Sequence, residues 1–342
     1  QKVLARDRTE ELRDSVTARL RAFAWDQWAQ LGVFAPTNRR DQAAADPEAL
    51  LLFTFEVGRG DPRLFDETLD WLLKNERLVS VQRLRNLCRD DDDRDLVEGA
   101  LLWIARQQPR SRSMPTQREE RASEPRLLFY DITRQIREPD EAFLAAGLLK
   151  PATEPSGKSR APDSDTPITF AFRMRHLFGL GTRAEVIRYL VTAPVTDASA
   201  LAIADAAAFA KRNVNETLTS LVASRMVTAY EHGNERRYYL DRAMWGQFLR
   251  FQPDSWPTYR DWPRLLGSLR RLSRWLQDGT LDQLTPYMLA SHARTLMEEL
   301  EPELALAGVP RSWMPEREGE HQWQTFVETV ERLLATLEPG WL

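Results

Sequence analysis

One short segment gathers the side chains that hydrogen-bond most readily to base edges and to phosphates. From Lys211 to Leu221, apolar residues recur at three- and four-residue intervals, as they do on the buried face of a helix. The opposite face is polar and consists of Lys211, Arg212, Asn213, Asn215, Glu216 and Thr219. Arginine pairs with guanine and asparagine with adenine, whereas lysine holds phosphate or, less selectively, a guanine edge. The spacing therefore predicts a helix that presents one polar face to DNA.

Two shorter helices are expected just before this segment. The first runs over residues 183–191, with Thr182 as its N-cap. The second begins near Ser199 and contains Ala204 and Ala206, small residues that let two helices cross closely. A turn around Ala208 then leads into the polar-faced helix.

A β-hairpin is expected directly after it. Residues 227–230 and 237–240 suit two short strands, and residues 232–235 suit the turn between them. Gly233 and Asn234 tolerate the positive φ that such turns require. Arg236 and Arg237 lie next to the tip, where arginines contact the DNA backbone or an adjacent minor groove.

This order of parts resembles the winged helix-turn-helix of transcription regulators of the ArsR and MarR type. The resemblance covers Thr182 to Asp241, about a sixth of the chain, and is carried by IADA at 203–206, KRNVNETLTSL at 211–221 and GNERRYYLD at 233–241. It implies that the DNA-facing positions are Arg212, Asn213, Asn215, Glu216, Thr219, Arg236 and Arg237. The chain departs from the family at Ala208, where many members have glycine, and at Glu216, which is negative. It also lacks the cysteine and histidine clusters of the metal sensors, so no metal is expected.

Charge distribution along the chain agrees with a nucleic-acid contact in this region. The whole chain of 342 residues has a net charge of −4. Residues 168–250 carry 11 Lys and Arg against 7 Asp and Glu, a net +4, and no other segment is net basic. A local basic patch, rather than the whole-chain charge, is what phosphate contact requires.

The patterning predicts a mainly α, multi-domain protein. We expect a helical N-terminal domain over 1–106, which a degenerate winged helix would also fit, and a linker with a short ordered island over 107–167. The winged helix-turn-helix domain occupies 168–250, and a helical domain for dimerisation, effector or partner binding occupies 251–342. Asp46-Pro47 and Asp61-Pro62 are helix-start signals within the first domain.

Composition indicates a cytoplasmic protein. No apolar run is long enough for a membrane span, and the polar start of the chain does not fit a signal peptide. The single cysteine, Cys88, excludes intrachain disulfides.

The remaining candidates for chemistry each have a simpler structural interpretation. The acidic run at 89–95, RDDDDRD, suits either a divalent cation or the start of a helix. The four histidines have no ligand spacing. Seven tryptophans between 245 and 341 suit a ligand pocket, an oligomer interface or a helical core. We find no catalytic constellation and expect neither an enzyme nor a cofactor.

The sequence therefore predicts a DNA-binding transcription regulator, a repressor that acts as a homodimer. Dimerisation would present two recognition helices to half-sites about 34 Å apart on double-stranded DNA. A small-molecule effector is compatible with this role. The alternative is an interaction protein, such as an antitoxin-like adaptor, whose winged helix binds a protein partner.

Overall fold

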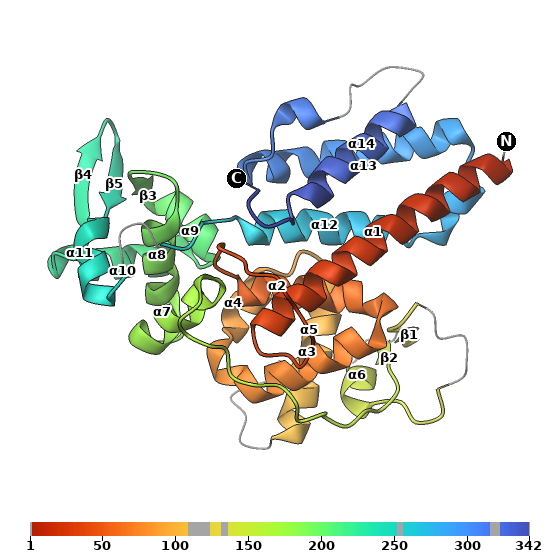
Figure 1. The fold of residues 1–342 in the computed structure, drawn as a ribbon, viewed down its shortest axis with the longest axis horizontal. Helices are drawn as coiled ribbons and strands as arrows, with labels where there is room; N and C mark the ends of the chain where they lie inside the picture. The colour runs from red at the N-terminus through yellow and green to blue at the C-terminus, as the bar shows by residue number, and fades with distance from the viewer. Residues whose placement is uncertain (1, 109–123, 131–135, 252–255, 315–321, 342) are drawn as a thin grey trace.

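Helices dominate the fold in the computed structural model, which describes residues 2–108, 124–130, 136–251, 256–314 and 322–341. Figure 1 shows two parts, a large helical part and a smaller part at one end that includes the longest strands. The larger part, called the body below, contains helices α1 (Lys2–Gln30), α2 (Pro47–Val57), α3 (Pro62–Asn75), α4 (Val81–Asn86), α5 (Asp91–Gln107), α6 (Glu141–Ala145), α12 (Trp262–Leu276), α13 (Pro286–Leu306) and α14 (Gln322–Ala335). No described helix has the length and apolar character needed to cross a membrane.

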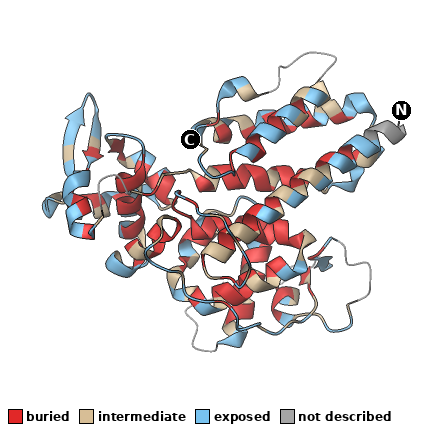
Figure 2. Ribbon diagram, in the orientation of Figure 1, coloured by how far each residue is buried: buried red, intermediate tan, exposed pale blue. Residues whose placement is uncertain are grey.

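The N-terminal and C-terminal regions form one hydrophobic core, although the sequence suggested two helical domains. Buried residues from α1 to α5 pack with those of α12, α13 and α14 in a single cluster. Every residue of α2 is buried, and α2 packs against both α1 and α12 (Figure 2). Trp262 and Trp275 also belong to this core. The apolar faces of the terminal helices are therefore covered by each other.

Aspartate-proline pairs start two of the body helices, as the sequence predicted. The carboxylate of Asp46 accepts a hydrogen bond from the Ala49 amide and caps α2, and that of Asp61 accepts one from Leu64 and caps α3. In the described stretch 2–108 the chain forms helices, turns and an isolated bridge, without a β-hairpin. The described part of the N-terminal region therefore contains no hairpin that could serve as the wing of a winged helix.

The ordered island predicted within residues 107–167 is part of the body. Strands β1 (Arg126–Leu127) and β2 (Leu148–Leu149) pair in parallel, and α6 lies between them in sequence. Phe143 is buried so closely against α5 that a Cβ on Gly99 would lie 2.5 Å from its ring. The Ser- and charge-rich part of the expected linker, residues 109–123, lies outside the described residues.

The smaller part, residues 170–249, is called the module below and has its own hydrophobic core. Its elements are α7 (Phe170–Phe178), α8 (Thr182–Thr192), β3 (Ala198–Ser199), α9 (Ala200–Ala207), α10 (Lys211–Ala223), β4 (Thr228–His232), β5 (Glu235–Tyr239) and α11 (Arg242–Leu249). The strands form one antiparallel sheet in the order β3-β5-β4. Helices α8, α9 and α10 pack against one another.

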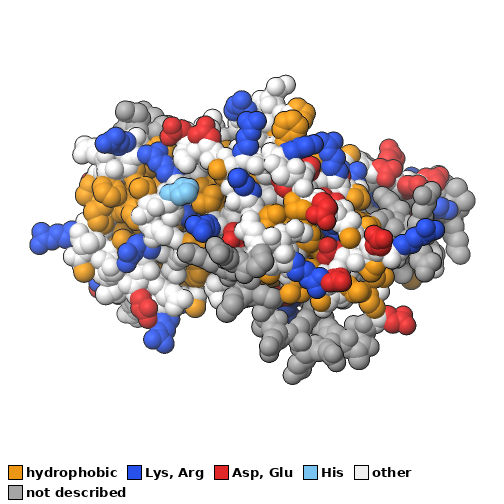
Figure 3. Space-filling model, turned by 90° about the horizontal axis from the view of Figure 1, so that it is seen from below, with side chains coloured by type: hydrophobic (Ala, Val, Ile, Leu, Met, Phe, Trp, Pro, Cys, Tyr) orange, Lys and Arg blue, Asp and Glu red, His pale blue; other side chains and the backbone are white. Residues whose placement is uncertain are grey.

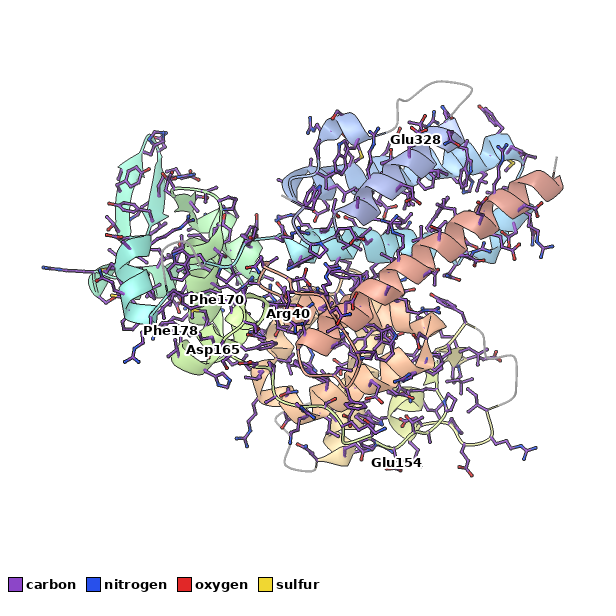
Figure 4. All side chains as sticks on the ribbon, viewed as in Figure 1. Arg40, Glu154, Asp165, Phe170, Phe178 and Glu328 are labelled. Atoms are coloured by element: carbon purple, nitrogen blue, oxygen red, sulfur yellow. The ribbon has the colours of Figure 1, made fainter. Side chains whose placement is uncertain are left out.

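Helix α7 connects the two cores through its opposite faces. Phe170 and Met174, one turn apart, belong to the module core. Phe172 belongs to the body core, where its ring lies 5.9 Å from that of Trp71. Figure 4 shows Phe170 and Phe178 within the module, near its boundary with the body.

Local signals place most module elements where the sequence predicted them. Ser199 caps α9 by accepting a hydrogen bond from the Ala202 amide. The predicted cap of α8 is wrong, because Gly181 occupies the cap position and Thr182 is the first helical residue. The hairpin has a two-residue turn in which only the first residue, Gly233, has positive φ, the pattern of a type II′ turn.

The turn between α9 and α10 depends on an alanine in a left-handed conformation. Ala208 has φ 54° and ψ 41° and ends α9. In this region the Cβ of an L-residue crowds the following carbonyl, which costs about 1 kcal/mol, whereas glycine adopts it freely.

Replacing Ala208 with glycine should therefore stabilise the protein. We expect Ala208→Gly to raise the free energy of unfolding by about 0.5–1 kcal/mol, since relief of strain exceeds the entropy added to the unfolded chain. Ala202→Gly, inside α9, is the control and should lower it by about 1 kcal/mol. Chemical denaturation of the three proteins measures both changes. Equal destabilisation by the two glycines would contradict this account of the turn.

Candidate nucleic-acid interface

The predicted polar face lies on one exposed side of α10. Val214, Leu218 and Leu221 are buried in the module core. The six predicted residues of the opposite face, Lys211, Arg212, Asn213, Asn215, Glu216 and Thr219, are all exposed. All but Asn213 border one shallow surface depression. The helix therefore brings these side chains to one accessible surface.

Two residues of this face already interact with each other. Arg212 Nε lies 3.1 Å from Glu216 Oε1, one helical turn away, and the two side chains are 88% and 67% exposed. An ion pair this exposed contributes little to stability, because water screens it. Arg212 can therefore exchange Glu216 for a phosphate or base at small cost, although Glu216 itself repels phosphate.

The two hairpin arginines differ in their surroundings. Arg236 is exposed and lies 3.9 Å from Glu231. Arg237 is half-buried and donates to Asp197 at 2.7 Å and to Glu235 at 2.9 Å. Hydrogen bonds from Tyr230 and Arg237 hold the pKa of Asp197 below its ordinary value. Arg237 thus ties β5 to the loop before β3, whereas Arg236 remains accessible at the tip.

The α9–α10 turn is fixed to the body by hydrogen bonds from α4. Arg83 Nε donates to the carbonyl oxygen of Ala207 at 2.8 Å. Asn86 Nδ2 donates to that of Ala208 at 3.0 Å. These carbonyls lie at the end of α9, where no intrahelical donor remains for them. The start of α10 is therefore positioned by the body as well as by the module core.

Arg83 is part of a buried network that joins the body to the module. Its guanidinium is fully buried and donates to both oxygens of Asp46 at 2.5 Å and to Glu48 at 2.7 Å. Glu48 also accepts two hydrogen bonds from Arg175 of α7, each 2.8 Å long. Its Oε1 also accepts a hydrogen bond from the backbone amide of Ser80, at 2.7 Å.

The network continues into α8 of the module. Arg175 Nη2 donates to Glu185 at 2.6 Å, and Arg188 Nε donates to the other Glu185 oxygen at 2.8 Å. Burial by itself raises the pKa of Glu185, but the surrounding guanidinium groups of Arg175, Arg188 and Arg83 lower it well below its ordinary value. Burial likewise raises the pKa of Asp46, but the charge and the hydrogen bonds of Arg83 outweigh this effect, so the pKa lies below its ordinary value. Three buried arginines thus neutralise three buried carboxylates across the boundary.

The acidic run at 89–95 starts a helix and pairs with arginines. Asp90 caps α5, and the next three aspartates form its first turn, where the helix dipole favours negative charge. Asp93 lies 3.0 Å from Arg270 and 3.1 Å from Arg274. Arg59 lies 3.0 Å from Asp92. The described partners of these carboxylates are therefore guanidinium groups and backbone amides, which supports the helix-start interpretation over a cation site.

Sequence reasoning missed the buried network, although the chain contains a signal for it. Residues 47–57, PEALLLFTFEV, are almost entirely apolar and would be buried on all sides, yet they contain Glu48 and Glu56. A buried carboxylate requires a partner. The two glutamates therefore indicated that arginines from other segments must reach this helix. The sequence does not show which arginines these are, because they lie far from the glutamates along the chain.

Comparison of the chain with known protein families, curated proteins and solved structures found no match.

The buried carboxylates should make stability depend on acidic pH. A carboxylate with a lowered pKa in the folded state adds stability that is complete above its unfolded pKa, about 4, and is lost as pH falls further. We expect Glu185→Gln to lower the free energy of unfolding by about 3–5 kcal/mol at pH 7, because it leaves buried arginine charge uncompensated. The difference from wild type should shrink as pH falls below about 4.

The control for this measurement is Glu328→Gln, on the exposed surface of α14 (Figure 4), which should change little at any pH. Denaturant titrations at pH 7, 5, 4 and 3 give the comparison. A Glu185→Gln effect that is constant across this range would show that the charge of Glu185 is not what stabilises the boundary.

Proposed function

We propose that this protein is a sequence-specific DNA-binding transcription regulator, a repressor, and that α8–α10 with the β4–β5 hairpin form a winged helix-turn-helix. The observation that carries the proposal is the polar face of α10, whose six predicted residues are exposed while the other face anchors the helix in the module core. Helices of this kind insert their N-terminal residues into the major groove.

The chemistry of the surface supports specific residue roles. Lys211, Arg212 and Asn213 occupy the first turn of α10, the end that enters the groove in such folds. Arg212 and an asparagine supply donors and acceptors for base edges, and Lys211 supplies charge for a phosphate. Arg236, on β5 next to the hairpin tip, would contact the DNA backbone or the adjacent minor groove. We assign Arg237 mainly to holding the hairpin, given its bonds to Asp197.

An exposed apolar surface on the module supports a homodimer. Leu177 and Phe248 are 56% and 59% exposed, and Leu180 and Met244 are also among the exposed large hydrophobic residues. Helices α7 and α11 are joined here by the Phe178–Trp245 ring contact, and Trp245 also contacts the Phe248 ring within α11. Figure 3 shows apolar side chains gathered at the module end of the molecule. A second chain covering this surface would bring a second copy of α10 into the same assembly.

The same surface favours one alternative. Exposed apolar side chains and ion-paired arginines also suit a winged helix that binds a protein, as in an antitoxin-like adaptor. The two functions differ in an observable way, because only the first requires tight binding to DNA at physiological salt.

The central prediction concerns Arg212. DNA from upstream of the protein's own coding region should bind more tightly than random-sequence duplex, with two chains per site. Arg212→Ala should weaken specific binding by about 1 kcal/mol or more, at least about fivefold. Arg294→Ala is the control. It breaks a similar exposed pair, Arg294–Glu298, but this pair lies on α13 of the body, outside the proposed DNA surface, so DNA binding should not change. Fluorescence anisotropy titrations at two salt concentrations provide the affinities.

Wild-type binding no tighter than to random duplex would defeat the proposal of specific binding, and equal losses for the two arginine variants would defeat the role of α10. A stoichiometric protein partner without DNA affinity would instead support the adaptor.

Glu216 gives a prediction of opposite sign. Glu216→Gln removes a negative charge from the surface and releases Arg212, so DNA affinity should rise by about two- to fivefold at low salt. Glu298→Gln, the matched change on α13, should leave it unchanged. The same anisotropy assay measures both variants. A decrease for Glu216→Gln would mean that this carboxylate contacts a base or organises Arg212, contrary to our assignment.

A further inference from the structure

A cleft with a volume of about 580 Å³ opens between the module and the body. On the module side it is lined by α9 and by the end of α8 with the loop that follows. On the body side it is lined by the start of α12, the residues preceding α12, the turn after α13, and Trp341. The volume lies within the range of pockets that hold small-molecule ligands, about 300–1,000 Å³. Its walls belong to both parts of the protein.

The lining of the cleft is mainly apolar and aromatic. Pro194, Val195, Leu265 and Leu306 supply aliphatic surface. Tyr189 of the module and Tyr259 of the body meet edge to face, with ring centroids 5.3 Å apart. Neither hydroxyl hydrogen-bonds to a residue in the part of the chain that the structure describes, so both remain available as donors to a ligand.

The charged residues of the lining already have partners within the protein. Arg264 donates to Asp261 at 2.6 Å and lies 3.9 Å from Asp205. Arg260 donates to the carbonyl oxygens of Thr336 and Trp341, and its guanidinium lies over the Trp341 ring at 5.3 Å. Two cations and two anions therefore leave the cleft with no net charge to match. A charged ligand would have to displace these existing contacts of Arg264 and Arg260 and would also lose its hydration.

We propose that this cleft is the effector site of the protein and binds a neutral, planar aromatic molecule that carries a carbonyl or similar hydrogen-bond acceptor. The aromatic and aliphatic walls bury the rings, and the tyrosine hydroxyls donate to the acceptor. This extends the role of the Trp-rich C-terminal region, where Trp341 lines the cleft while Trp262 and Trp275 lie in the core.

Position links this site to the proposed DNA surface. Ala202, Asp205 and Ala206 of α9 line the cleft, and α9 leads through the Ala208 turn into α10. A ligand bound here contacts α9 on one side and the body on the other. If the ligand-bound and DNA-bound forms differ in the position of α9, the ligand changes the affinity for DNA. DNA must then change the affinity for the ligand by the same factor. The regulatory part of this inference rests on the proposed function, whereas ligand binding does not.

Nile red tests the site directly, because it is neutral and planar, carries a carbonyl and emits more strongly in apolar surroundings. With the full chain and no DNA, we expect saturable binding of one dye per chain. Ala202→Trp fills the cleft from α9 and should weaken dye binding at least tenfold. Ala243→Trp, at an exposed position of α11, is the matched control and should leave dye binding unchanged. Tyr259→Phe should weaken binding several-fold by removing one donor.

The controls separate this cleft from other apolar surfaces. Val195→Trp fills it from the loop after α8 and replaces Ala202→Trp if that variant unfolds. Three results would overturn the site. They are dye binding that does not saturate, dye binding that is undiminished in both cleft-filling variants, and a loss of dye binding caused by Phe248→Ser on the module surface.

DNA titrations with and without saturating dye test the coupling. We expect at least a threefold change in DNA affinity. Unchanged DNA affinity with dye bound would overturn the regulatory role. Absence of specific DNA binding without dye would instead overturn the proposed function and leave the dye site standing.

Discussion

The structure depends on one buried constraint, the neutralisation of Asp46, Glu48 and Glu185 by Arg83, Arg175 and Arg188. Each of these six side chains is almost completely shielded from water. Removing a charge from water costs several kcal/mol, and only well-placed partners offset that cost. The partners come from the start of α2, from α4 and from α7 and α8. The network is therefore complete only when module and body adopt one relative position, so the charges determine how the two parts are joined.

This constraint reaches the proposed DNA surface through two side chains of α4. Arg83 takes part in the network and also donates to the carbonyl of Ala207, the last residue of α9, while Asn86 donates to the carbonyl of Ala208. The turn before α10 is thus held from outside the module, in addition to the packing of Val214 and Leu218 within it. The exposed face of α10 has the opposite character, with solvated side chains and weak ion pairs that can be exchanged at low cost. A rigid support beneath an adaptable polar surface suits recognition of a fixed object such as a DNA groove.

How much of this follows from the sequence depends on the range of the interactions. Local rules predicted the Asp46 and Asp61 caps, the start of α9 after Ser199, the two faces of α10 and the Gly233 turn, because each involves residues a few positions apart. The union of the terminal regions in one core was not predicted, since apolar periodicity shows that a face is buried but not what covers it. The pairing of Glu48 with Arg175, and of Arg237 with Asp197, also escaped prediction. Those contacts join residues 127 and 40 positions apart.

In the proposed function, α10 reads DNA sequence as part of a two-fold assembly. Selection of bound duplexes from a random-sequence pool at physiological salt tests it most directly, because it requires no assumption about the target. We expect enrichment of a palindromic motif whose half-sites are spaced by about one helical turn or a multiple of it, and loss of that motif when the selection is repeated with Arg212→Ala. A pool that remains random with the wild-type protein would contradict the claim.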